Sequence, residues 1–394
     1  MTLRLLPLLL AAFIPPVMAG ATPFDEALAE VMNNNLSARA EASRSQITAE
    51  SILGENTLEA PEASFSHVWG SPKGTVNKWS ISVSQSFDWP GVYAARREAA
   101  RTASTASQYL LESTLLDLRQ ETRTLFIDII HNTQLIEMQS ELAERMNQME
   151  AYYKKAAEAG AETRLDYNKT VIERIAVHRE LHTLEAERST LIATLESLNG
   201  GKDVSGIISK LGNAYPITKI PTSINEATIR ERDPQYAAAM AGVDAAKSMV
   251  KVEKRSRIPG FSIGYEHENE GEERFNGFSI GITLPVWSRK HQIKVSTLEA
   301  EASLFDAELA LTRRVSEMNS DKKQLDTLRH IMNEYEPEVN DKSNYELLHK
   351  ALKAGQITFL TYIEEANYFI AAKRDYLDTL YEYNLILTRL SRYE

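Results

Sequence analysis

His178 and His182 have a spacing that could hold a metal ion. They lie four residues apart in the segment HRELH, and Glu185 follows, so a helix would place all three side chains on one face. The segment is not the His-Glu-x-x-His pattern of zinc proteases, because Glu180 stands one position too late. Charged neighbours favour an exposed helix face, and we predict no metal site here.

The sequence supports no other catalytic chemistry. It contains no Gly-rich phosphate loop, no Gly-x-Ser-x-Gly elbow and no cysteine. Carboxylates are abundant, but no spacing brings a pair of them together, so we predict a non-enzymatic protein without a cofactor. The net charge of −11 also argues against nucleic acid as a partner, since phosphates require basic surfaces.

Three carboxylates could instead select cations in a pore. Asp166 lies in the segment AGAETRLDY, and Glu364 and Glu365 closely follow the related segment AGQITFLTY. Rings of acidic side chains favour cations through their electrostatic field. A solvated helix face is the alternative interpretation of each acid, so these residues are candidate aperture acids.

The two segments belong to a longer internal repeat. They share the pattern Ala-Gly-x-x-Thr-x-Leu-x-Tyr, and the segment SISVSQSF likewise has a counterpart, SIGITLPV, about 200 residues later. We therefore predict two tandem copies of one structural unit, residues 20–199 and 225–394, joined by a connector at 200–224. The N-terminal residues 1–19 form a predicted signal peptide, because a short apolar run follows Arg4 and ends at small residues.

Each predicted copy contains very long helices. A first helix, a strand pair, a long helix and a returning helix follow one another. Apolar residues alternate in steps of four and three along the long helices, which indicates coiled-coil packing, and about 65 residues would span about 100 Å. Gly160 and Gly355 would end them, and Thr163 and Thr358 would cap the returning helices. In the first copy the predicted first helix covers residues 24–53, the long helix 92–159, and the returning helix starts at 163. In the second copy the first helix covers 225–257, the long helix 292–354 with a kink at Pro337, and the returning helix starts at 358.

The predicted strand pairs are apolar on one side only. They cover residues 63–70 with 78–89 and 260–268 with 277–286, and their length and aromatic ends are typical of outer-membrane barrels. No stretch after the signal peptide could form a membrane helix, so membrane contact would use strands or a surface. Four strands cannot close a barrel, and lipid excludes open edges, so several chains must share it. The membrane-facing side chains would be Trp79, Ile81, Val83, Phe87, Trp89, Phe278, Ile280, Ile282, Leu284 and Val286.

These features together resemble the TolC-type outer membrane efflux family. The resemblance rests on the repeat, on QSFDWPG before a long Ala-rich helix, on GITLPVWSRK and on the twin Ala-Gly tips. Within the family the sequence is most similar to the CzcC-like branch, which serves heavy-metal cation efflux. The expected fold class is mainly α with a small β part, in which long coiled-coil hairpins join a four-stranded contribution to a trimeric transmembrane β-barrel.

The resemblance implies an efflux duct and its partners. A homotrimer would form a twelve-stranded barrel in the outer membrane of a Gram-negative bacterium and a helical tunnel through the periplasm. A periplasmic adaptor (membrane fusion protein) and an inner-membrane resistance-nodulation-division (RND) pump would dock on it. Two departures, Gln356–Ile357 and Thr361, place the family's closed-tip contacts in question. The implied docking residues are Gly160, Thr163, Leu165, Gly355, Thr358 and Leu360.

Two alternatives remain open at this point. A soluble periplasmic coiled-coil adaptor or scaffold would explain the long helices without the strands. A channel of the same form could also export organic compounds or proteins, because the pump makes most of the substrate selection.

Overall fold

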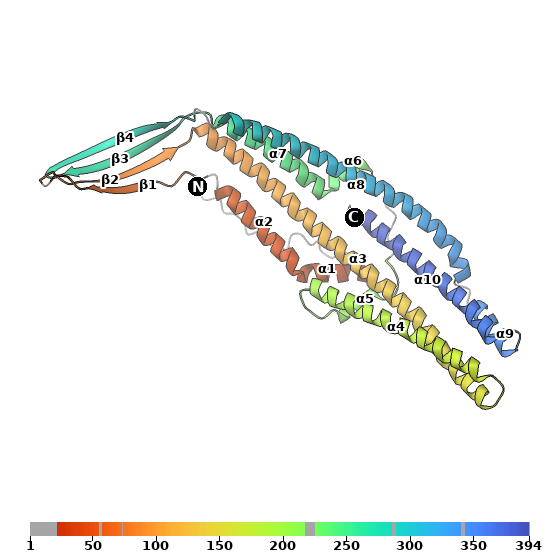
Figure 1. The fold of residues 1–394 in the computed structure, drawn as a ribbon. Coiled ribbons are helices and arrows are strands. Elements are labelled where there is room, and N and C mark those ends of the chain that lie inside the picture. The colour runs from red at the N-terminus through yellow and green to blue at the C-terminus, as the bar shows by residue number, and fades with distance from the viewer. Residues whose placement is uncertain are drawn as a thin grey trace. The chain divides into compact units, whose positions relative to one another are not determined.

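The computed structural model describes residues 22–54, 57–72, 74–216, 225–285, 289–339 and 343–393. The predicted signal peptide and Val286 lie outside this part. Helices predominate, and four strands form a single sheet (Figure 1). The elements are α1 Pro23–Asn34, α2 Leu36–Gly54, β1 Glu62–Val68, β2 Lys78–Phe87, α3 Pro90–Glu158, α4 Arg164–Leu198, α5 Ser205–Leu211, α6 Glu226–Arg232, α7 Pro234–Arg255, β3 Gly260–Glu270, β4 Glu273–Thr283, α8 Arg289–Val339, α9 Ser343–Lys353 and α10 Phe359–Leu390, with a short 3-10 turn at Ser391–Tyr393.

The first predicted helix of each copy is two helices. Asn35 separates α1 from α2, and its Oδ1 accepts a hydrogen bond from the backbone N–H of Ala38 at 2.9 Å. Asp233 separates α6 from α7 in the same way and accepts from the N–H of Tyr236 at 2.9 Å. Short polar side chains of this kind start a new helix by capping it, and Pro234 disfavours helical backbone at Asp233. The prediction of one continuous helix was therefore wrong at both sites.

The long helix of the second copy is described in two parts. α3 runs unbroken for 69 residues, whereas α8 reaches Val339 with Pro337 inside it, and α9 is described from Ser343. Proline cannot donate to the preceding turn, and its ring crowds the carbonyl four residues back, so a kink is expected at Pro337. Residues 340–342 lie outside the described part, so a single helix over residues 292–354 stays a prediction.

The region between the copies contains an amphipathic helix. α5 lies within the predicted connector, and Val204, Ile207 and Leu211 are buried. The glycine, proline and serine content of the connector concealed this pattern, whose apolar residues recur at helical spacing. Residues 217–224 of the connector lie outside the described part.

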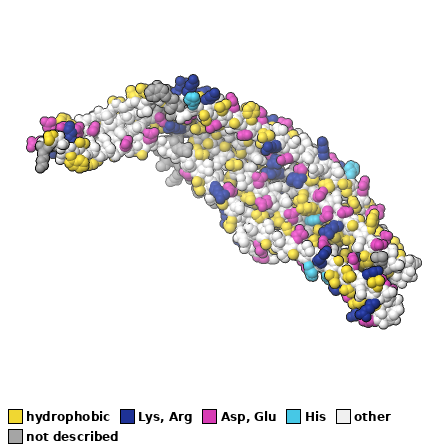
Figure 2. Space-filling model, in the orientation of Figure 1, with side chains coloured by type: hydrophobic (Ala, Val, Ile, Leu, Met, Phe, Trp, Pro, Cys, Tyr) yellow, Lys and Arg dark blue, Asp and Glu magenta, His cyan; other side chains and the backbone are white. Residues whose placement is uncertain are grey.

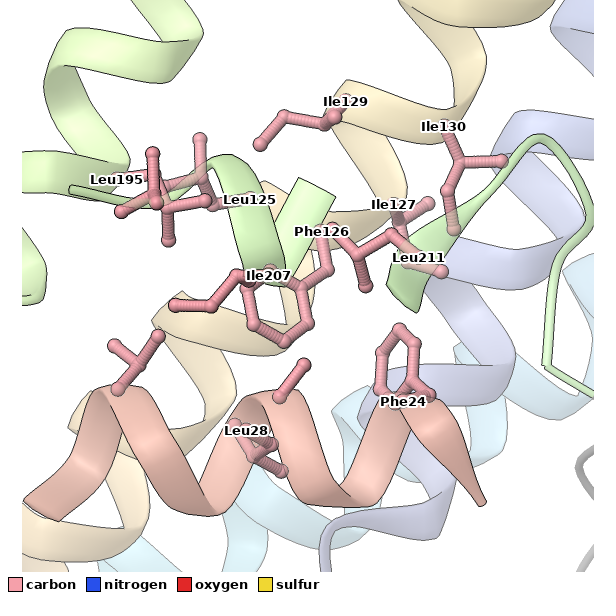
Figure 3. Packing of buried hydrophobic residues seen from close by; sticks show 13 residues of the cluster. Phe24, Leu28, Leu125, Phe126, Ile127, Ile129, Ile130, Leu195, Ile207 and Leu211 are labelled. Atoms are coloured by element: carbon pink, nitrogen blue, oxygen red, sulfur yellow. The ribbon is translucent and has the colours of Figure 1, made fainter. Parts of the chain in front are cut away.

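The chain forms two compact units, and each draws on both predicted copies. Unit 1 comprises residues 1–40, 114–224 and 315–394, and unit 2 comprises residues 41–113 and 225–314. In unit 1, α1, α3, α4 and α5 surround the main hydrophobic core (Figure 3). The rings of Phe24 and Phe126 meet edge to face at 5.3 Å. Each fully buried side chain of this size contributes about 1.5–3 kcal/mol.

Unit 2 contains the sheet, whose strands are antiparallel in the order β1-β2-β3-β4. β2 and β3 come from different predicted copies and pair over ten residues, from Lys78 opposite Glu270 to Phe87 opposite Phe261. The last pair stacks its rings at 5.3 Å. Within the described residues, β1 and β4 each have a neighbouring strand on one side only.

The second hairpin is tighter than predicted. β3 continues to Glu270 and β4 begins at Glu273, so only two residues form the turn, where a long loop was expected. Gly271 has a φ of +64°, a conformation that glycine adopts without strain and that suits the first position of a two-residue hairpin turn. β4 ends at Thr283, so Leu284 lies beyond the strand, as Trp89 lies beyond β2.

Candidate functional sites

The register of the sheet aligns the apolar residues of all four strands on one face. Phe65 of β1 pairs with Ile81 of β2, and Tyr265 of β3 pairs with both Val83 and Phe278. Towards the helices the rows continue with Ile263 beside Ile280 and with Phe261 beside Ile282. Because side chains alternate between the faces of a sheet, these residues form one apolar surface.

This apolar face is widely exposed in the single chain. Phe278 is 86% exposed, Ile280 80% and Ile282 69%, while Ile81 and Val83 are about half exposed. Trp79 and Phe87 are partly covered by neighbouring rings. Soluble monomers rarely leave large apolar surfaces uncovered, so the face requires an apolar medium or partner. At the hairpin end, hydrophobic and acidic side chains both reach the visible surface (Figure 2).

The opposite face carries small and polar residues. The serine hydroxyls of β1 and β2 are close to each other, with Ser64 and Ser82 at 2.8 Å and Ser66 and Ser80 at 3.0 Å. At Gly264, a Cβ would lie 2.6 Å from the Oγ of Ser279, so a larger residue would displace this packing. The sheet thus separates an apolar surface from a hydroxyl-rich one.

Charges gather on the polar face towards the hairpins. Glu266, Glu268 and Glu270 of β3 alternate onto this face, and Lys78 lies opposite Glu270. The Nζ of Lys78 is 3.6 Å from Glu268 Oε1 and also pairs with Glu270. The polar face therefore carries both charged groups and hydroxyl groups that water can solvate.

The apolar face ends in amphipathic rings. His67 packs against Trp69 with ring centroids 4.8 Å apart, and Trp79 packs against His267 at 5.3 Å. The Oδ1 of Asn276 accepts hydrogen bonds from the Tyr265 hydroxyl at 2.7 Å and from His267 Nδ1 at 2.8 Å. Rings with one apolar and one polar end are typical of a boundary between apolar medium and water.

The two Ala-Gly tips have the same backbone structure. Gly160 and Gly355 have φ angles of +73° and +66°. After the first glycine, the N–H of Ala161 donates to Ala156 O at 2.8 Å, and after the second, the N–H of Gln356 donates to Ala351 O at 2.9 Å. Both are Schellman motifs, which satisfy the last carbonyls of a helix. The predicted helix stops are confirmed.

Thr163 and Thr358 are the predicted N-caps, and both are confirmed. The Oγ1 of Thr163 accepts from the N–H of Asp166 at 3.1 Å, and the Oγ1 of Thr358 accepts from the N–H of Thr361 at 3.2 Å. Leu165, in the first turn of α4, is 63% exposed. The side chain of Leu360 lies outside the described part. The backbone of each tip is thus fixed at both ends, while Leu165 at the first tip remains accessible.

The candidate aperture acids have unequal surroundings. The carboxylate of Asp166 accepts from the Thr163 hydroxyl and lies 3.8 Å from Lys169 Nζ, so it contributes to a helix cap. Glu364 and Glu365 are exposed on α10. The described part of this chain contains no group of three or more acidic or histidine side chains that could hold a metal ion.

The His178–His182 pair does not form a ligand set. His178 Nε2 lies 3.0 Å from Asn147 Oδ1, and His182 Nδ1 lies 3.0 Å from Glu185 Oε2. The ring centroids are 6.3 Å apart. Each histidine has its own polar partner, which fits the exposed face expected from the sequence.

A half-buried titratable cluster was not predicted from the sequence. His131 and Asp128 of α3 meet Tyr381 and Asp378 of α10 within unit 1. Burial lowers the pKa of the His131 imidazole, and the Asp378 carboxylate opposes that shift. Burial also raises the pKa of the Asp128 carboxyl, although the Tyr381 hydroxyl donates to it. A histidine at an otherwise apolar helix position was the available signal, but its partners lie about 250 residues away in the sequence.

Among the helices described, none is long and apolar enough to cross a membrane. No protein-family model and no curated protein matches the sequence. Solved structures do share its fold, as the outer-membrane channel OprN does with a TM-score of 0.79 and 13% identity, over 94% of this chain and 89% of that one. CusC, a transmembrane channel, matches with a TM-score of 0.78 and 14% identity, over 93% of this chain and 91% of that one. The CmeC outer membrane channel of Campylobacter jejuni matches with a TM-score of 0.74 and 16% identity, over 94% of this chain and 85% of that one.

Proposed function

We propose that this chain is the outer-membrane channel of a tripartite export system and belongs to the TolC-type family. The observation that carries the proposal is the four-stranded sheet, which exposes an apolar face on one side and serine, glycine and charged residues on the other. Its similarity to outer-membrane channels over nearly the whole chain supports the same conclusion. The apolar face would contact lipid, and the polar face would line a water-filled lumen.

Further copies of the chain would close the barrel. An open sheet edge in lipid leaves backbone groups unpaired, at several kcal/mol each. The β1 edge follows α2, where Ile47 is 68% exposed, and the β4 edge precedes α8, where Leu298 and Phe305 are 53% and 68% exposed. Each edge strand thus adjoins in the chain a helix with exposed apolar side chains. One copy's β4–α8 side would join the next copy's β1–α2 side, which gives a ring, and the family resemblance gives three copies.

The tips would be the docking site for the partners. Gly160 and Gly355 stop the helices, Thr163 and Thr358 restart them, and Leu165 is exposed beside them. A periplasmic adaptor would contact these turns together with Leu360, and an inner-membrane RND pump would supply the energy. The channel itself would conduct passively. Asp166, Glu364 and Glu365 would lie near the aperture and favour cations.

Heavy-metal cations are the proposed cargo. The resemblance to the CzcC-like branch and the acids next to the tips support this choice. A deletion strain should lose tolerance to cobalt, zinc, cadmium or copper and keep its tolerance to organic drugs. Unchanged metal tolerance together with a new drug sensitivity would contradict the metal cargo and favour an organic one.

Membrane fractionation tests the channel proposal itself. The full chain, expressed in a Gram-negative host, should sediment with outer membranes, require detergent for extraction and migrate as a trimer before heating. Recovery as a soluble monomer from the periplasm would refute the channel and favour a coiled-coil scaffold. The variant Ile47→Gln changes an exposed side chain on the proposed contact between copies and should lower the temperature at which the trimer dissociates.

A further inference from the structure

The helices α3 and α10 meet through a half-buried polar cluster, next to the apolar contact of Leu377 with Leu135 and Met138. His131 of α3 stacks on the ring of Tyr381 of α10, with centroids 4.4 Å apart and planes 21° apart. Its Nε2 lies 3.1 Å from Asp378 Oδ1, and the Tyr381 hydroxyl donates to Asp128 Oδ1 at 2.8 Å. Two residues of each helix therefore add one stacking and two polar interactions to the apolar packing between α3 and α10.

The imidazole is poorly placed to carry a positive charge. Its side chain is only 14% exposed, and its Nδ1 is buried with no hydrogen-bond partner among the described residues. The buried hydroxyl of Tyr215, beyond α5, likewise has none. A protonated imidazole would add a second N–H without an acceptor, and a buried donor without an acceptor costs about 1–3 kcal/mol.

The surrounding charges do not compensate for this burial. Burial outweighs the attraction of the carboxylates and lowers the pKa of His131, and the Arg374 guanidinium acts in the same direction. The titratable and charged groups that face the site are Asp128 on α3, Glu187 on α4, Arg374, Asp378 and Tyr381 on α10, and Tyr215.

We propose that His131, Tyr381 and Asp378 form a proton-operated latch, which holds α10 against α3 while the imidazole is neutral and releases α10 when the imidazole takes up a proton. α10 begins at the Thr358 cap, so the latch acts on the helix that carries one of the two tips. The latch depends only on packing within unit 1 and would operate whatever the chain conducts.

The sign of the pH dependence follows from linkage. Because the folded chain holds the His131 proton less tightly than the unfolded chain does, the contact is fully stable above the unfolded pKa of about 6.5 and weakens as the pH falls below it. Asp128 acts oppositely, since its raised pKa favours the folded state as it becomes protonated. A variant that removes only the histidine therefore isolates the latch.

Hydrogen exchange of the detergent-solubilised full chain tests the latch. Amides of residues 374–388 should exchange faster at pH 5.5 than at pH 7.5 after correction for intrinsic rates, by up to about tenfold per pH unit below 6.5. His131→Gln, which keeps a neutral hydrogen-bonding side chain, should abolish this dependence. His182→Gln removes an exposed histidine on α4, with a side chain 72% exposed, and should leave it intact.

A second variant keeps the test decisive if His131→Gln folds poorly. Asp378→Asn removes the largest attraction for the imidazolium and should shift the onset of faster exchange to lower pH. The latch is refuted if the wild type exchanges identically at both pH values, if α10 becomes better protected in acid, or if either variant at the cluster behaves like His182→Gln.

Discussion

A single arginine on the sheet should reveal what the apolar face contacts. Ile280 lies between Phe278 and Ile282 on the apolar face of β4, and its side chain is 80% exposed in the single chain. If lipid covers this face, Ile280→Arg forfeits most of the about 1.5–3 kcal/mol gained by burying isoleucine. Arginine near the midplane of a barrel costs about 2–4 kcal/mol per chain. The arginine cost alone should make folding in vesicles about 30- to 700-fold less favourable per chain.

The neighbouring residue Ser279 supplies the matched control. It points to the opposite face of the same strand, where Ser279→Arg would enter the polar side and should cost less than about 1 kcal/mol. Urea unfolding of the two variants in phospholipid vesicles measures the difference directly. Equal stabilities, or a larger loss for Ser279→Arg, would refute the assignment of lipid to the apolar face.

The remaining predictions concern the helices. Gly160→Ala should destabilise unit 1 by about 1–2 kcal/mol, because the glycine has a positive φ. Gly242 lies within α7 with no atom near a Cβ, so Gly242→Ala should stabilise the chain by about 0.5–1 kcal/mol, and thermal unfolding compares the two variants. Thr163→Ala should cost about 0.5–2 kcal/mol in urea unfolding by removing the cap of α4, while Thr163→Ser should restore it. Phe126→Ala should cost about 3–5 kcal/mol by opening a cavity in the core, and an unchanged unfolding midpoint would contradict the packing.

Local chemistry explains which features the sequence predicted well. The alternation around Ile81 defines two faces, and the twin glycines and threonines define helix ends, because each depends on residues close in sequence. The fold class, mainly α with long helices and one four-stranded sheet, followed from these elements and agrees with the structure.

Features that depend on distant partners were harder to predict. The pairing of β2 with β3 and the meeting of His131 with Tyr381 join residues far apart in sequence. The helix starts at Asn35 and Asp233 could have been recognised, since Asn and Asp cap helices, but the apolar periodicity continued through both positions. Asp166 was a candidate aperture acid with a solvated helix face as the alternative, and its use in a helix cap appeared only from the hydrogen bonds.

Cysteine scanning along β4 tests the central claim most directly, because the natural chain contains no cysteine. Single cysteines at residues 277–283 would carry an environment-sensitive probe in vesicles. We expect brominated lipid to quench probes at Phe278, Ile280 and Ile282, and a water-soluble quencher to reach those at Gly277, Ser279 and Gly281. A uniform response to the aqueous quencher at all positions would contradict a sheet with one face in lipid and one in water.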